Sequence, residues 1–67
     1  MKITLHTNSS GQLMIYVPKK DLEEEVITQI QTDDAQIFTL SNGWQLSVDG
    51  LTSPFATPQT VRARRLQ

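Results

Sequence analysis

Hydrophobic and polar residues alternate most clearly between residues 38 and 48, where two apolar runs flank the dipeptide Asn42-Gly43. An Asn-Gly step between alternating segments predicts a tight β-hairpin, because glycine adopts a positive φ without steric cost. A two-residue turn would place the two apolar runs on opposite faces. A three-residue loop over residues 41–43 with a glycine bulge faces Leu40 with Trp44 instead, and all the large apolar residues then share one face. The pattern therefore predicts this loop and a core formed by Phe38, Leu40, Trp44, Leu46 and Val48.

The same alternation predicts further strands on either side of the hairpin. Residues 1–7 and 12–17 each place apolar side chains on one face, and the second segment ends at Pro18, which has no N–H for a strand ladder. Residues 59–66 alternate in the same way and predict a last strand. The expected fold is all-β, a small antiparallel barrel-like domain of five or six short strands. Curling the sheet into a barrel would hide edges that an open sheet exposes.

Two segments are less regular. Asp21 and Glu24 could cap a helix over residues 21–31. The β-branched residues of this segment favour instead one turn near residues 19–24, followed by a strand over residues 25–31 with Val26, Thr28 and Ile30 at alternate positions. We predict the turn and the strand, and the helix stays open as an alternative. Residues 49–58 contain an Asp-Gly and two X-Pro steps, which are typical of a loop, and its length leads us to expect that Phe55 holds it against the barrel.

Composition limits the function classes that this chain can serve. Its 67 residues predict a single domain, residues 1–67, which buries only roughly 60% of its unfolded surface and needs most of its apolar residues for the core. The absence of cysteine excludes disulfides, thiolate metal sites and a cysteine nucleophile. His6, the single histidine, is interpreted as a solvated residue, so no metal or cofactor is expected. No apolar run approaches the ~20 residues of a membrane span, and we expect a cytoplasmic protein without membrane contact.

Three pieces of the sequence carry a family resemblance. They are YVPKKDLEE at residues 16–24, LSNGWQL at residues 40–46 and VRARRL at residues 61–66. In this order and at these spacings the chain resembles the NifT/FixU family, small proteins encoded within nitrogen-fixation gene clusters. The match spans nearly the whole chain, and its first piece is the most specific. The chain departs from the family pattern at Glu25, where relatives often carry proline, and at residues 32–36, where a Trp-Gly-Gly-like step is expected.

The resemblance implies a barrel-like all-β fold and supports the turn-plus-strand interpretation of residues 19–31. It implies a context rather than a reaction, namely an accessory role in nitrogenase production or maturation, and it supplies no catalytic residues. The sequence also lacks a Ser–His–Asp order and a glycine-rich phosphate loop. We therefore expect a protein that is not an enzyme and that binds a nitrogenase component or an assembly factor for one.

The most specific piece of the resemblance continues through charged residues at the end of a strand. Mixed charge at the end of a strand is normally just a solvated turn. Core packing does not determine the identity of surface lysines, however, so packing alone does not explain this piece, and it carries the binding hypothesis. The expected partner-binding residues are Tyr16, Lys19, Lys20, Asp21, Glu23 and Glu24.

The alternative function is that of a small β-barrel adaptor or polyanion-binding module. It would use the basic patch of the last strand, formed by Arg62, Arg64 and Arg65, and its binding would weaken with salt. Small barrels that bind nucleic acid usually interleave aromatic and basic residues. Only Tyr16 is expected to be an exposed aromatic residue here, and the net charge of −1 provides no overall attraction, so nucleic acid is the less favoured partner.

Overall fold

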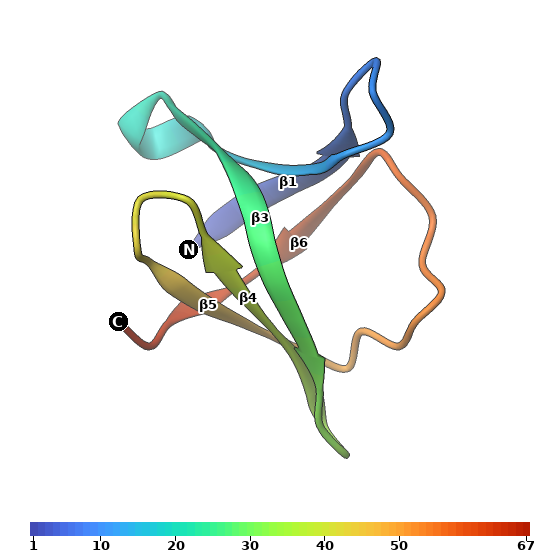
Figure 1. The fold of residues 1–67 in the computed structure, drawn as a ribbon. Coiled ribbons are helices and arrows are strands. Elements are labelled where there is room, and N and C mark those ends of the chain that lie inside the picture. The colour runs from blue at the N-terminus through green and yellow to red at the C-terminus, as the bar shows by residue number, and fades with distance from the viewer.

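The computed structural model describes all residues 1–67 and shows an all-β domain with one short 3-10 turn (Figure 1). The predicted fold class is confirmed, although the chain forms seven strands rather than five or six. The elements are β1 (Lys2–Thr7), β2 (Leu13–Val17), η1 (Pro18–Lys20), β3 (Leu22–Gln31), β4 (Ala35–Leu40), β5 (Gln45–Asp49), β6 (Gln59–Arg62) and β7 (Arg64–Arg65).

The strands form one antiparallel sheet that curls into a nearly closed barrel (Figure 1). Their order is β6-β1-β2-β3-β4-β5-β7, so the two ends of the sheet are consecutive pieces of the chain. The single strand predicted over residues 59–66 is therefore split in two. The chain leaves its pairing with β1 at the buried residue Ala63 and pairs with β5 instead. This crossing joins β6 and β7, the two ends of the sheet, and closes the barrel.

The hairpin of β4 and β5 has the register that the sequence predicts. Gly43 has a φ of +93°, its N–H donates to the Leu40 carbonyl at 2.9 Å, and the Leu40 N–H donates to the Trp44 carbonyl at 2.8 Å. Phe38 faces Leu46 across the hairpin, and both are fully buried. The placement of Trp44 in the core needs correction, because this side chain is only half-buried and packs against the edge of the core.

The core fills the inside of the barrel with side chains from nearly every strand. Phe55, from the loop between β5 and β6, packs edge-to-face on Phe38 with the ring centroids 6.1 Å apart, so the predicted anchoring of this loop is confirmed. The buried cluster consists of Ile3, Leu5, Ile15, Val17, Val26, Phe38, Leu40, Leu46, Val48 and Ala63.

The ambiguous segment after β2 forms a turn and a strand, not a helix. The turn η1 is followed by Asp21 in the left-handed region, and β3 begins at Leu22, earlier than residue 25, where the strand was expected. The predicted inward alternation beyond Val26 is wrong. A bulge between Val26 and Thr28 shifts the phase of the strand, and Ile30 is left 56% exposed. No helix in the structure has the length and the apolar composition needed to cross a membrane.

Candidate functional site

Most of the residues that sequence analysis predicted to bind a partner lie on the outer surface of β1, β2 and β3 or at its edge. Strand alternation directs Ile3 and Leu5 into the core and His6 to the outside. The register then places Tyr16 of β2 opposite Glu23 of β3, so these side chains also share the outer surface. The sheet thus gathers on one face residues that are far apart in the sequence.

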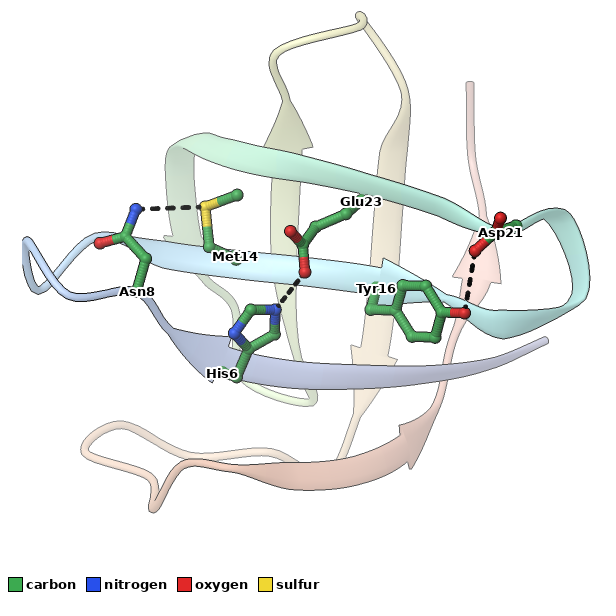
Figure 2. A network of polar contacts seen from close by, with 6 residues as sticks. All are labelled: His6, Asn8, Met14, Tyr16, Asp21 and Glu23. Carbon is green, nitrogen blue, oxygen red and sulfur yellow. Dashed lines mark hydrogen bonds and ion pairs between the residues drawn. The ribbon is translucent and has the colours of Figure 1, made fainter.

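His6 and Glu23 are in direct contact across this surface. The imidazole Nε2 lies 2.8 Å from the Glu23 Oε2, and the contact passes over β2 between the side chains of Met14 and Tyr16 (Figure 2). The side chains are 28% and 50% exposed, so this is a surface contact rather than a buried ion pair. His6, which sequence analysis interpreted as a solvated residue, is therefore a partner of one of the predicted binding residues.

Tyr16 is held by a second contact at the end of the same strand. Its hydroxyl donates to Oδ1 of Asp21 at 3.2 Å (Figure 2). Asp21 ends the 3-10 turn with a φ of +48°, and its N–H donates to the Pro18 carbonyl at 3.2 Å. The hydrogen bond to Asp21 is the main reason that the pKa of Tyr16 is raised; desolvation and the negative charges of Asp21 and Glu23 raise it further.

Lys19 and Lys20 lie on the turn η1 that connects β2 to β3, at the edge of this surface. Both are exposed, and neither takes part in the two ion pairs of the structure. We call the surface formed by His6, Tyr16, Lys19, Lys20, Asp21 and Glu23 the polar face. It combines side chains that contact one another with two exposed lysines that form no ion pair.

Glu24 does not belong to the polar face. It follows Glu23 in the strand and therefore points to the opposite side of the sheet, where its Oε1 accepts a hydrogen bond from the Ser41 hydroxyl at 2.6 Å. The backbone N–H of Ser41 also donates to the Glu25 carbonyl at 2.8 Å. Glu24 thus links β3 to the β4–β5 turn.

The three arginines of the predicted basic patch have different surroundings. Arg62 lies opposite Lys2 in the pairing of β6 with β1. Arg64 lies 4.0 Å from the Asp49 carboxylate, and the Arg65 guanidinium lies 3.9 Å from the centroid of the Trp44 ring. Sequence analysis did not place Trp44 beside these arginines. The structure therefore divides the patch, with two of its cations already in contact with other side chains.

Metal-binding chemistry has no assembled site in this structure. Contacts between acidic residues and histidine are limited to the pair of His6 and Glu23. No group of three or more His, Cys, Asp or Glu side chains is placed to share a metal ion.

Comparison with known proteins identifies the family. Residues 1–63 match the profile of the family described as NifT/FixU protein. The chain belongs to the NifT/FixU family. The resemblance carried by the three sequence pieces is thereby confirmed, and it associates the chain with nitrogen fixation.

The chain is similar to two proteins of nearly its own length and to one much longer protein. A FixU homolog of Sinorhizobium fredii is 35% identical over 68 residues, which cover 98% of this chain and 87% of that protein. NifT of Azotobacter vinelandii is 31% identical over 67 residues, covering 94% of this chain and 90% of that protein. Protein MosB of Rhizobium meliloti is 40% identical over 67 residues, which cover 98% of this chain but only 13% of MosB. The same unit thus makes up most of two proteins and a small part of a third.

Proposed function

We propose that this NifT/FixU protein serves nitrogen fixation by binding a nitrogenase component, or an assembly factor for one, through the polar face, and that it does so without catalysing a reaction. The observation that carries the proposal is the arrangement of this face. Tyr16 and Glu23 are held in place by Asp21 and His6, while the neighbouring lysines have no ion-pair partner.

Such an arrangement suits recognition of another protein. Side chains that are already fixed lose less conformational entropy on binding, which lowers the free-energy cost of forming a complex. Free cations beside fixed acidic side chains supply a pattern of both signs, and charge patterns determine partner choice and association rate more than affinity. The polar face therefore has the properties of a specific, charge-complementary contact surface.

The open position of the face favours binding over catalysis. General acid–base catalysis needs a side chain held against a bound substrate in a geometry that excludes most water. His6 and Glu23 lie on the outside of a sheet, and the single groove of the structure is lined by residues of other segments. This placement supports a surface that meets a macromolecule.

The occurrence of the unit in proteins of different length adds support. A domain that is nearly the whole of one protein and 13% of another behaves as a transferable module. Tethering a binding module to a larger protein raises the effective concentration of its partner, which is a reason for joining the two.

Co-purification from nitrogen-fixing cells tests the proposal. The tagged protein and its K19E/K20E variant would be recovered in parallel, with ammonium-fed cells as the reference. The matched control is R64E/R65E, which makes the same change in net charge at two exposed residues of β7, away from the polar face. Thermal unfolding of each variant would show that the barrel is intact.

The proposal expects a nitrogenase subunit or assembly protein to accompany the wild type and the control, and to be lost from K19E/K20E. Equal recovery with both variants would mean that the polar face is not the binding surface. Failure to recover any nitrogenase-related protein, under conditions that preserve a known weak assembly contact, would contradict the function itself.

The alternative, polyanion binding through Arg62, Arg64 and Arg65, is favoured by one observation, the proximity of Trp44 to Arg65. An aromatic ring among arginines could stack on a nucleic-acid base. The alternative predicts that a single-stranded oligonucleotide binds and that the logarithm of its affinity falls linearly with the logarithm of salt concentration. Absence of binding at low salt would remove it.

A further inference from the structure

The barrel has a seam between β5 and β6 at which the sheet is not continuous. β5 pairs with β7 only at Leu46 and Ser47, while β6 pairs with β1 along its other edge. β5 and β6 lie close together near Ala63 and move apart with increasing distance from it. An open groove of about 450 Å³ lies between them, lined by both strands and by the start of the following loop. The seam is therefore hollowed where a further strand would complete the sheet.

The edge of β6 presents unpaired backbone groups to this groove. The Ala63 N–H donates to the Met1 carbonyl at 2.7 Å, and the Met1 nitrogen donates to the Ala63 carbonyl at 2.6 Å, so these two residues form a doubly bonded pair. Bonded and non-bonded pairs alternate in an antiparallel ladder. Thr60 and Arg62 fall on the non-bonded positions, and their N–H and C=O groups turn away from β1 towards the groove.

On the opposite side of the groove, β5 also has one residue, Asp49, whose backbone groups are unpaired and point towards the seam. The Gln45 N–H donates to the Gln67 carbonyl, and its own carbonyl accepts from the Leu66 N–H, both at 2.8 Å, so Gln45 directs its backbone towards the seam. Asp49 lies four residues after Gln45. Because the direction of the backbone N–H and C=O groups alternates along a strand, those of Asp49 also point towards the seam. It lies beyond Ser47, the last residue of β5 that pairs with β7. Unpaired strand edges of this kind are templates for pairing with another chain.

The groove is lined by apolar side chains and by the cations of Arg62 and Arg64, with Asp49 as its single acidic side chain. Val61 and Leu51 are half-buried, and Val48 is buried. Arg62 has no ion pair, and Arg64 is 69% exposed with only a 4.0 Å contact to Asp49. A segment with alternating apolar and acidic side chains would complement both parts.

We propose that the groove binds an extended acidic segment of another protein, which adds as a strand to the free edge of β6. Antiparallel pairing is the more stable arrangement, so the segment is expected to run antiparallel to β6. The four residues of β6 offer about 13 Å of edge at ~3.3 Å per residue, which suits a segment of about four residues. The proposal does not rest on the polar face, which uses other residues, so each can fail without the other.

A proline substitution tests the strand addition. Along the backbone, T60P removes a single N–H, which points away from β1, and proline is tolerated on a strand edge at such a position. T60V is the matched control, because both variants lose the Thr60 hydroxyl that lies 3.3 Å from the Thr4 hydroxyl, and only T60P loses the N–H. The probe is a pool of acetylated octapeptides that alternate Val, Ile or Thr with Asp or Glu. The comparison pool has Asn and Gln in place of the acids.

Binding would be followed by the backbone amide resonances and amide hydrogen exchange of the isotope-labelled protein. With the acidic pool, the resonances of the Thr60 and Arg62 amides should shift and their hydrogens should exchange more slowly. The acidic pool should bind about tenfold more tightly than the neutral pool, because its carboxylates form charge-assisted hydrogen bonds with Arg62 and Arg64. T60P should weaken binding about tenfold, and T60V should not. R62Q/R64Q should remove the preference for the acidic pool.

A second measurement avoids any dependence on the folding of T60P. Peptides N-methylated at their acidic residues keep their charges but lose the N–H groups that would pair with Thr60 and Arg62, so their binding should be lost. Equal binding of methylated and unmethylated pools, or no response of the Thr60 and Arg62 amides to either pool at millimolar concentration, would overturn the proposal. Binding of a single-stranded oligonucleotide at the groove in T60P and T60V alike, with no response to the peptides, would assign the groove to a polyanion instead.

Discussion

His6 and Glu23 belong to strands that are not neighbours in the sheet, yet the His6 Nε2 lies 2.8 Å from the Glu23 Oε2 because the two side chains meet over β2. Partly exposed pairs of this kind contribute about 0.2–1 kcal/mol. A double-mutant cycle of H6Q and E23Q in urea unfolding should therefore give a coupling free energy below about 1 kcal/mol. A coupling indistinguishable from zero would show that the contact does not form in solution, and the proposal that His6 holds Glu23 in the polar face would lose its basis.

Tyr16 and Asp21 allow a direct test of the polar face in solution. Since Tyr16 is the single tyrosine of the chain, its phenolate absorbance reports its ionisation alone. D21N removes the main cause of the raised Tyr16 pKa and should move that pKa down towards the ordinary value, and E23Q should have a smaller effect in the same direction. E25Q is the control, because Glu25 is not among the causes. An unchanged titration in D21N would mean that the Tyr16–Asp21 contact is not populated.

The same contact makes the stability dependent on alkaline pH. A tyrosine whose pKa is raised in the folded state binds its proton more tightly there than in the unfolded chain. Its contribution to stability is complete below about pH 10, the ordinary tyrosine pKa, and is lost as the pH rises through the raised value. Y16F should remove this part of the pH dependence, as measured by urea unfolding at several alkaline pH values.

Phe55 is expected to control the order of the loop over residues 50–58. F55A removes an aromatic ring that is half-buried and packs on Phe38, and should lower the free energy of unfolding by about 2 kcal/mol. T52A is a control in the same loop, at an exposed side chain, and should change it by less than about 0.5 kcal/mol. Equal stabilities of the two variants would show that Phe55 does not anchor the loop.

Trp44 should report the loss of its cationic neighbour. Because the Arg65 guanidinium covers the indole ring, R65A should expose Trp44 to water and shift its fluorescence to longer wavelength, with a loss of about 0.5–1 kcal/mol in stability. R64A should leave the emission unchanged, since Arg64 contacts Asp49 rather than the ring. An unshifted spectrum in R65A would contradict the stacking.

Local patterns predicted the parts of the fold that depend on near neighbours in the chain. The register of the β4–β5 hairpin followed from the position of Gly43 and from the requirement that Phe38 and Leu46 share a face. The anchoring of the loop by Phe55 followed from its length. The position of Glu24 was missed, because the start of β3 at Leu22 determines which of the glutamates points inward.

Features that depend on the arrangement of the whole sheet could not be predicted in the same way. The bulge beside Ile27 depends on the pairing of β3 with β4. The periodicity of the sequence contains no sign of it, so the prediction continued the regular alternation of the strand beyond Val26. The contact of His6 with Glu23 requires the strand order, and so does the proximity of Arg65 to Trp44. The side of β3 on which each candidate binding residue lies came only with the register, which separates Glu23 from Glu24.

The crossing of the chain at Ala63 also has a consequence for the folding reaction. Ile3 pairs with Val61, so barrel closure requires the joining of segments separated by almost the full chain length. Domains dominated by such non-local pairings fold slowly, on the order of milliseconds to seconds, because the entropy of loop closure is lost before the contacts form. Closure is thus the expected rate-limiting event, and until it occurs β1 presents an open edge to other chains. Truncation of Val61, the β6 side chain that packs against the core, should therefore slow folding more than an equally destabilising substitution in the β4–β5 hairpin.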